Sequence, residues 1–294
     1  MDFLFHLVNG LSLGSIYAII ALGYTMVYGI AKMLNFAHGD VIMVGAYVSY
    51  CAFMYWGLPP MVAILAAMAF CTALGVIIER LAYRPLRQAT SLAVLITAIG
   101  MSYLLQNVAL LIFKSDFKNY PKEIIDFAGF SLFNGQLPIS GVTLVTITAN
   151  IVIMVLLNLF INRTKLGKAM RCVSEDRGAA ELMGISVNRT IAVTFAIGSA
   201  LAAIAGVLYC SAYHTFNPYT GSLPGIKAFT AAVFGGIGSI PGALIGGILL
   251  GIIEIFGRAY ISTELADAIV FVVLIIILLV KPSGLLGKQI REKV

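Results

Sequence analysis

Long apolar runs, separated by short polar or turn-forming segments, dominate the chain. Runs of this length are typical of transmembrane helices, because about 20 helical residues cross the bilayer core. A further apolar stretch at 226–239 is too brief for an ordinary crossing. Glycine, proline and charged residues mark the breaks. We predict helices at 5–30, 37–55, 60–79, 91–113, 140–161, 190–214, 241–257 and 266–281.

The composition supports a membrane protein. Of the 294 residues, 60% are apolar and only 11% are charged, whereas about 25% of a soluble domain is charged. The predicted fold is therefore all-α, a polytopic transmembrane helix bundle of eight or nine segments, some short or discontinuous, that forms one domain over 1–294. The four cysteines lack metal-ligand spacing and are interpreted as small buried apolar residues; they are Cys51, Cys71, Cys172 and Cys210.

Lysine and arginine residues indicate which helix ends face the cytoplasm. The net charge is +6, and 13 of the 19 basic residues lie in 79–88, 162–189 and the tail 281–293. Basic loops preferentially stay on the cytoplasmic side. The loop 114–139 balances its charges and is expected outside. Segment 226–239 must then cross as a short or broken helix, and the side of the N-terminus stays open, because 37–55 is either a full crossing or re-entrant.

A glycine-rich segment joins the short apolar stretch to the next helix. Seven glycines fall within 235–251, some with the GxxxG spacing that lets helix backbones approach closely. Close packing alone would also suit an inert bundle. The glycine-rich residues 235–241, at the start of the helix predicted at 241–257, nevertheless predict a break. Broken membrane helices recur in transport pathways. The residues assigned to the break and its packing are Gly235, Gly236, Gly238, Pro241, Gly242 and Gly246.

A polar segment from Asn35 to Asp40 separates two apolar helices. A charged aspartate at the centre of a span costs about 2.5–3.5 kcal/mol, so Asp40 must face protein or water. Asp40 or Asn35 caps the helix that starts near Val41, this helix start borders a polar translocation pathway, or both hold. His38 is a further pathway candidate, and we expect no metal site, because this histidine has no neighbouring ligands in the sequence.

Charged residues also occur within later apolar runs. Glu254 either extends toward the interface, faces the pathway or pairs with Arg258 one turn later, and we expect the pair. Lys32 and Lys227 lie near predicted helix ends, where a long side chain can place its ammonium group at the membrane surface. Glu254 therefore joins Asn35, His38 and Asp40 as a candidate pathway residue.

The segment 162–189 contains a candidate docking helix. Ser174 suits the N-cap, and Gly184 suits the position after the helix. The predicted helix of about nine residues is marginal alone in water, and it presents apolar side chains. We therefore expect it to occupy a groove in a partner protein rather than to be an ordinary surface turn. The apolar side chains that it presents are Ala179, Ala180, Leu182 and Met183.

Several enzymatic motifs are absent from the sequence. It contains no phosphate-binding GxxxxGK[ST] loop, no HExxH and no GxSxG. We expect no enzymatic activity, and any energy from ATP must come through a partner. A secondary carrier driven by protons or sodium is the rival transport class, although intramembrane ionisable residues are sparse.

Two long motifs resemble the permease subunits of branched-chain amino acid ABC importers, the LivH type. Residues 10–29 together with Asn35–Asp40 look like the amino-terminal signature of this family, and Lys227–Ala243 looks like the carboxy-terminal one. The loop 165–185 is similar to the coupling segment with which ABC permeases engage their ATPases. The resemblance assigns the ATPase contact to Glu175, Asp176, Ala179, Ala180, Leu182 and Gly184, which match the general permease pattern loosely. The resemblance covers essentially the whole chain.

The resemblance implies a set of partners. These are a homologous second permease subunit of the LivM type, two cytoplasmic ATPase subunits that bind ATP and magnesium, and a periplasmic binding protein that delivers leucine, isoleucine or valine. It also implies a bacterial inner membrane, contact with lipid, no cofactor in this chain and no nucleic acid. Importers of urea and short amides use similar permeases and are the alternative.

Overall fold

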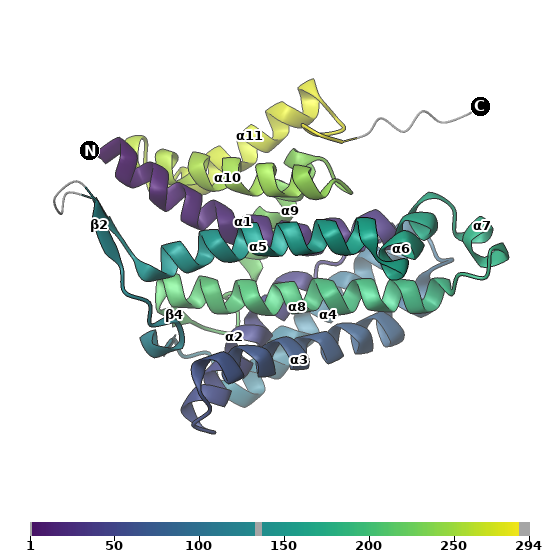
Figure 1. Cartoon of the computed structure of the whole chain (residues 1–294), viewed down its shortest axis with the longest axis horizontal. Coiled ribbons are helices and arrows are strands. Elements are labelled where there is room, and N and C mark those ends of the chain that lie inside the picture. Colours follow the sequence, from purple (N-terminus) through teal and green to yellow (C-terminus); the bar gives the residue numbers. More distant parts are fainter. Residues whose placement is uncertain (1, 133–136, 288–294) are drawn as a thin grey trace.

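The computed structural model describes residues 2–132 and 137–287. Its helices form a bundle, most of them along the longest axis of the molecule (Figure 1). Two short helices, α6 (Lys165–Glu175) and α7 (Arg177–Leu182), connect α5 to α8. The apolar helices of the bundle are α1 (Asp2–Ala31), α2 (His38–Met54), α3 (Pro60–Ile78), α4 (Ser91–Phe113), α5 (Gly141–Arg163), α8 (Val187–Tyr213), α9 (Ser222–Gly235), α10 (Ile240–Tyr260) and α11 (Ala266–Val280).

The predicted helical bundle is confirmed. Each of the eight expected helices is present, with ends within three residues of the prediction, and six helices are long and apolar enough to cross a membrane. The short stretch at 226–239 is α9, which ends at Gly235. The next four residues are not helical, and Gly236 and Gly238 have φ of +105° and +93°. The predicted break before α10 is therefore present, and glycine permits it because it lacks a Cβ.

Short connecting elements complete the fold. A π-helical turn (Glu79–Tyr83) and a 3-10 turn (Arg84–Leu86) follow α3, and a 3-10 turn (Lys122–Ile125) lies in the 114–139 loop. Residues 133–136 of this loop lie outside the described residues. Two antiparallel strand pairs were not predicted: β1 (Lys118–Asn119) with β4 (Thr215–Phe216), and β2 (Phe130–Leu132) with β3 (Leu137–Ile139).

The two ends of the bundle differ in charge. Helices α6 and α7 lie at one end, and the N-terminus and β2 lie at the other (Figure 1). At the first end, the Arg177 guanidinium donates to the carbonyl of Ala31, and Arg87 pairs with Glu79 and Asn188. The basic segments 79–88 and 162–189 therefore meet at one end of the bundle, as the assignment of both to the same side of the membrane requires. The tail residues Lys288, Arg291 and Lys293 lie outside the described residues.

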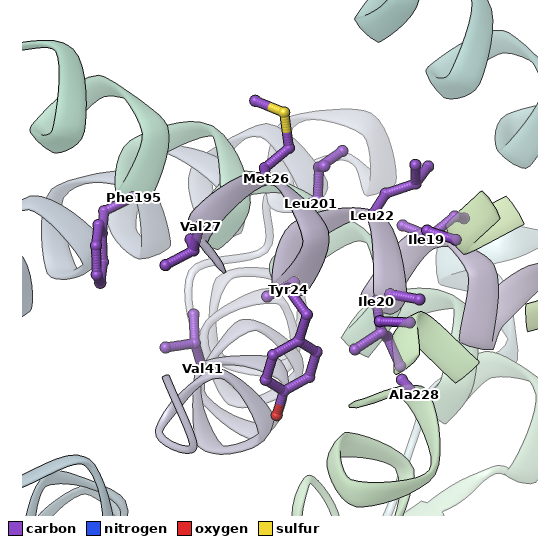
Figure 2. Packing of buried hydrophobic residues seen from close by; sticks show 14 of the residues in the cluster. Ile19, Ile20, Leu22, Tyr24, Met26, Val27, Val41, Phe195, Leu201 and Ala228 are labelled. Carbon is purple, nitrogen blue, oxygen red and sulfur yellow. The ribbon is translucent and has the colours of Figure 1, made fainter. Parts of the chain in front are cut away.

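Helix α1 is the centre of the bundle. Its residues Ile19, Leu22 and Val27 are fully or almost fully buried. They pack among side chains of α8 and α9, including Phe195 and Ala228 (Figure 2). Peripheral helices are different. In α4 only 17% of the most apolar 18-residue stretch is buried, whereas 67% of the corresponding stretch of α8 is buried. The exposed apolar faces of α3, α4 and α5 are suited to lipid or to a second membrane subunit.

Glycines let α1 and α10 approach backbone to backbone. A Cβ on Gly251 would lie 2.2 Å from the nitrogen of Gly14, whereas one on Gly100 of α4 would meet no atom within 4 Å. We expect Gly251→Ala to destabilise the protein by about 1–3 kcal/mol through overpacking. Gly100→Ala, the matched control, should be neutral or stabilising because alanine favours helix. Thermal unfolding in detergent measures both, and a Gly251→Ala protein that melts at or above the wild type would contradict this packing.

Candidate functional site

A polar cavity of about 290 Å³ lies between the first turns of α2 and α9 and the middle of α4. Asp40, Ser102 and Gln106 form its polar side, together with Ser222 at the first position of α9. Its remaining walls are mostly apolar or aromatic. They consist of Tyr24, Phe36, Gly39, Ile99, Tyr103, Gly225 and Ile226.

Asp40 is held by side chains of another helix. The Ser102 hydroxyl donates to one carboxylate oxygen, and Gln106 Nε2 lies 2.9 Å from the other. Gln106 Nε2 also lies 3.2 Å from Ser222 Oγ, which links α4 to α9. The Asp40 side chain is 1% exposed. Its position in the first turn of α2 further favours a negative charge, because the helix dipole is positive there.

The capping interpretation of this segment is wrong. Helix α2 begins at His38, and its N-cap, Ala37, makes no side-chain hydrogen bond. The Asp40 carboxylate instead accepts hydrogen bonds from side chains of α4. Asn35 Oδ1 accepts a hydrogen bond from the Tyr83 hydroxyl at 2.9 Å. Side chains more than 40 residues away in the sequence therefore satisfy both polar groups, which local pattern does not reveal.

Of the four predicted pathway residues, only Asp40 lines this cavity. His38 is buried against α1, where its ring centroid lies 4.6 Å from that of Tyr24. A Cβ on Gly23 would lie 2.5 Å from His38 Nε2, so the imidazole fills the space that this glycine leaves. Asn35 points to Tyr83, and Glu254 belongs to a separate cluster.

Two interrupted helices meet at the cavity. A Cβ on Gly221, just before α9, would lie 1.9 Å from the carbonyl oxygen of Gly39, and one on Gly225 would lie 2.8 Å from Gly39 Cα. These glycines therefore bring the first turns of α2 and α9 into backbone contact. Discontinuous membrane helices that start at a shared site direct two positive helix ends toward it. The cavity thus combines a carboxylate with two helix N-termini.

Glu254 is the centre of a buried charge cluster. Its carboxylate lies 2.8 Å from Lys227 Nζ and 2.9 Å from the Tyr17 hydroxyl, and it pairs with Arg258. The predicted Glu254–Arg258 pair is confirmed. Lys227 also lies 2.6 Å from Asp267 Oδ1 and is only 4% exposed. The prediction that Lys227 places its ammonium group at the membrane surface is therefore wrong. The carboxylates recover part of the cost of burying this ammonium.

The segment that follows α11 covers the break between α9 and α10. The backbone N–H groups of Leu285 and Leu286 donate to the carbonyls of Phe234 and Gly235, each at 2.9 Å. They satisfy carbonyls that a helix end leaves without partners. A Cβ on Gly235 would lie 1.9 Å from the carbonyl oxygen of Gly242, so α9 and α10 are in backbone contact. Gly246, one turn further along α10, approaches Ala231 of α9 in the same way.

The segment 162–189 contains two helices rather than one. The N-cap of α7 is Asp176, whose side chain accepts from Ala179 N at 3.0 Å, so the prediction of Ser174 as the N-cap is wrong. Ser174 lies in the last turn of α6, and Gly184 has the predicted left-handed conformation, with φ +81°. Helix α6 was missed, although its buried Gly167, Met170 and Val173 have helical spacing.

The predicted contact residues are mostly free at the tip of this segment. Leu182 is 90% exposed and the adjacent Met183 is 81% exposed. Glu175, Asp176, Ala179 and Gly184 are also exposed, whereas Ala180 is buried and anchors α7. Burial and the neighbouring Arg87 lower the pKa of Arg177 at the start of α7. The arrangement leaves an apolar tip at the end of the bundle where α6 and α7 lie (Figure 1).

The groups that surround Asp40 were not predicted from the sequence. Ser102 and Gln106 are polar residues four positions apart in a mostly apolar helix, which places them on one helix face. That spacing was the available signal. Ser222 and Asp267 carried no comparable signal, because each lies near a predicted helix end where polar residues are common.

A bundle of membrane-spanning helices, two of which start inside it at a polar cavity, defines a polytopic membrane permease. A family model described as "Branched-chain amino acid transport system / permease component" matches residues 6–278. The chain belongs to this family. Together with its membrane-length helices, this membership places the chain in the inner membrane of a bacterium as a multi-pass protein.

Similar proteins match over nearly the whole chain. LivH of Escherichia coli, a high-affinity branched-chain amino acid transport system permease protein, is 47% identical over 99% of this chain and 98% of its own length. BraD of Pseudomonas aeruginosa, which has the same description, is 46% identical over the same shares. A probable LivH of Methanocaldococcus jannaschii is 28% identical over 93% of this chain and 89% of its own.

Proposed function

We propose that this chain is the membrane permease subunit of an ATP-binding-cassette importer and forms part of the pathway for leucine, isoleucine and valine. The observation that carries the proposal is the Asp40 cavity at the starts of α2 and α9. Polar, non-helical backbone at membrane depth is tolerated where it is buried or lines a water-filled cavity. The high identity to LivH and BraD over the full length supports the branched-chain substrates.

ATP and magnesium are bound by two ATPase subunits in this proposal, and the chain itself needs no cofactor. The exposed Leu182 and Met183 at the tip of α7 supply an apolar contact for one ATPase. A homologous second permease of the LivM type covers part of the exposed helix faces, and a periplasmic protein delivers the substrate. Closure of the ATPase pair moves α7 and tilts the bundle between outward-open and inward-open states.

Reconstitution separates this proposal from its rivals. Proteoliposomes with this chain, the second permease and both ATPases should take up leucine only when ATP and the binding protein are supplied. An ion-coupled carrier would instead take up leucine with this chain alone under a proton or sodium gradient. Uptake of urea or a short amide in place of leucine would favour the other importer class.

A further inference from the structure

Asp40 has no counter-ion in the part of the chain that the structure describes. Among residues 2–132 and 137–287, the carboxylates that form ion pairs are Glu79, Glu254 and Asp267. A buried carboxylate that borders a cavity and lacks a cation is costly, and in membranes such groups mark substrate sites. Building on the proposed function, we propose that the Asp40 carboxylate binds the α-ammonium group of the translocated amino acid.

The carboxylate is positioned for this contact. Ser102 donates to Oδ2 and Gln106 donates to Oδ1, so α4 fixes the orientation of the group from one side. An ionised carboxylate offers about four acceptor sites, and these two bonds use one on each oxygen. A ligand in the cavity, which Asp40 lines, would use the remaining sites. A primary ammonium group donates three hydrogens and suits this acceptor.

The opposite end of an amino acid has a matching environment. Ser222 is the first residue of the 14-residue helix α9, and its hydroxyl oxygen lies 3.2 Å from Gln106 Nε2. Carboxylates are stabilised at helix N-termini, where the dipole is positive. The ammonium at Asp40 therefore orients the substrate with its carboxylate toward Ser222 and the start of α9.

Apolar walls complete the cavity. Phe36, Ile99 and Ile226 line it, and its volume is about 290 Å³. Small-molecule sites span about 300–1,000 Å³, so this cavity is just below that range and suits a single amino acid. Urea or a short amide would offer the carboxylate only neutral N–H donors and would leave the apolar wall without a partner. The chemistry thus selects a zwitterion with an apolar side chain.

Binding to the purified permease–ATPase complex in nanodiscs, without the binding protein, tests the assignment. Two probes share a carbon skeleton: leucine, and 4-methylpentanoate, which lacks the ammonium group. The wild type should bind leucine at least about tenfold more tightly than 4-methylpentanoate, because a charge-assisted hydrogen bond is worth about that factor. Asp40→Asn should reduce leucine affinity to the level of 4-methylpentanoate, because asparagine keeps the shape and loses the charge.

Asp116→Asn is the matched control, because it makes the same change at an exposed position of the 114–139 loop. Its leucine affinity should equal that of the wild type. Equal affinity of the wild type for leucine and 4-methylpentanoate would overturn the assignment, and this comparison needs no variant. Wild-type leucine affinity in an assembled Asp40→Asn complex would overturn it as well.

Failure of the proposed function has a different signature. In that case the wild-type complex takes up no leucine even with ATP and the binding protein. Failure of the Asp40 assignment alone leaves wild-type uptake intact, and Asp40→Asn takes up leucine at the same rate. The two results are therefore distinguishable in one reconstituted system.

Discussion

Replacing Ala179 and Leu182 together by aspartate should abolish ATPase association and leucine uptake. Both side chains are exposed on α7, and Leu182 is 90% accessible. Two carboxylates buried without partners in an apolar contact would cost several kcal/mol, and loss of a central contact residue alone costs about 2 kcal/mol or more. Copurification of the ATPases and uptake into proteoliposomes measure the effect.

The same substitutions should leave the fold intact. Changes at exposed positions usually alter the free energy of unfolding by less than about 0.5 kcal/mol, so membrane insertion and thermal unfolding should match the wild type. Phe117→Asp is the control, because Phe117 is 74% exposed in the loop at the opposite end of the bundle. A doubly substituted complex that still assembles and transports would show that α7 is not the ATPase contact.

Lys227→Met should destabilise the protein by about 3–5 kcal/mol, the usual effect of breaking a buried ion pair. Lys227 lies between the carboxylates of Glu254 and Asp267, at 2.8 Å and 2.6 Å. Without it, Glu254 keeps only its pair with Arg258, and Asp267 keeps no ion pair among the described residues. Thermal unfolding of the purified complex measures the loss.

A second substitution identifies charge as the cause. Lys227→Met combined with Glu254→Gln leaves one anion, Asp267, and one cation, Arg258, so it should recover at least part of the lost stability. Lys122→Met, at an exposed position of the outer loop, should be within about 0.5 kcal/mol of the wild type. A single Lys227→Met variant as stable as Lys122→Met would show that the cluster contributes nothing to stability.

The Glu254 cluster and the Asp40 cavity both form where the fold brings together distant segments of the chain. Tyr17 and Glu254 form a 2.9 Å hydrogen bond although 237 positions separate them, and 66 positions separate Asp40 from Gln106. Such pairs leave no periodic signal in a single sequence. The expected pair between Glu254 and Arg258 was predictable because four positions along a helix bring side chains to the same face.

The sequence by itself determined where the membrane helices run and where they break. Backbone polar groups in lipid must be satisfied within the helix, so apolar length alone specifies a crossing, and Gly235–Pro241 specified the interruption before α10. Only the tertiary structure decided the partners of Asp40, Asn35 and Lys227, because the free energy of burying a polar or charged group depends on which helix packs against it.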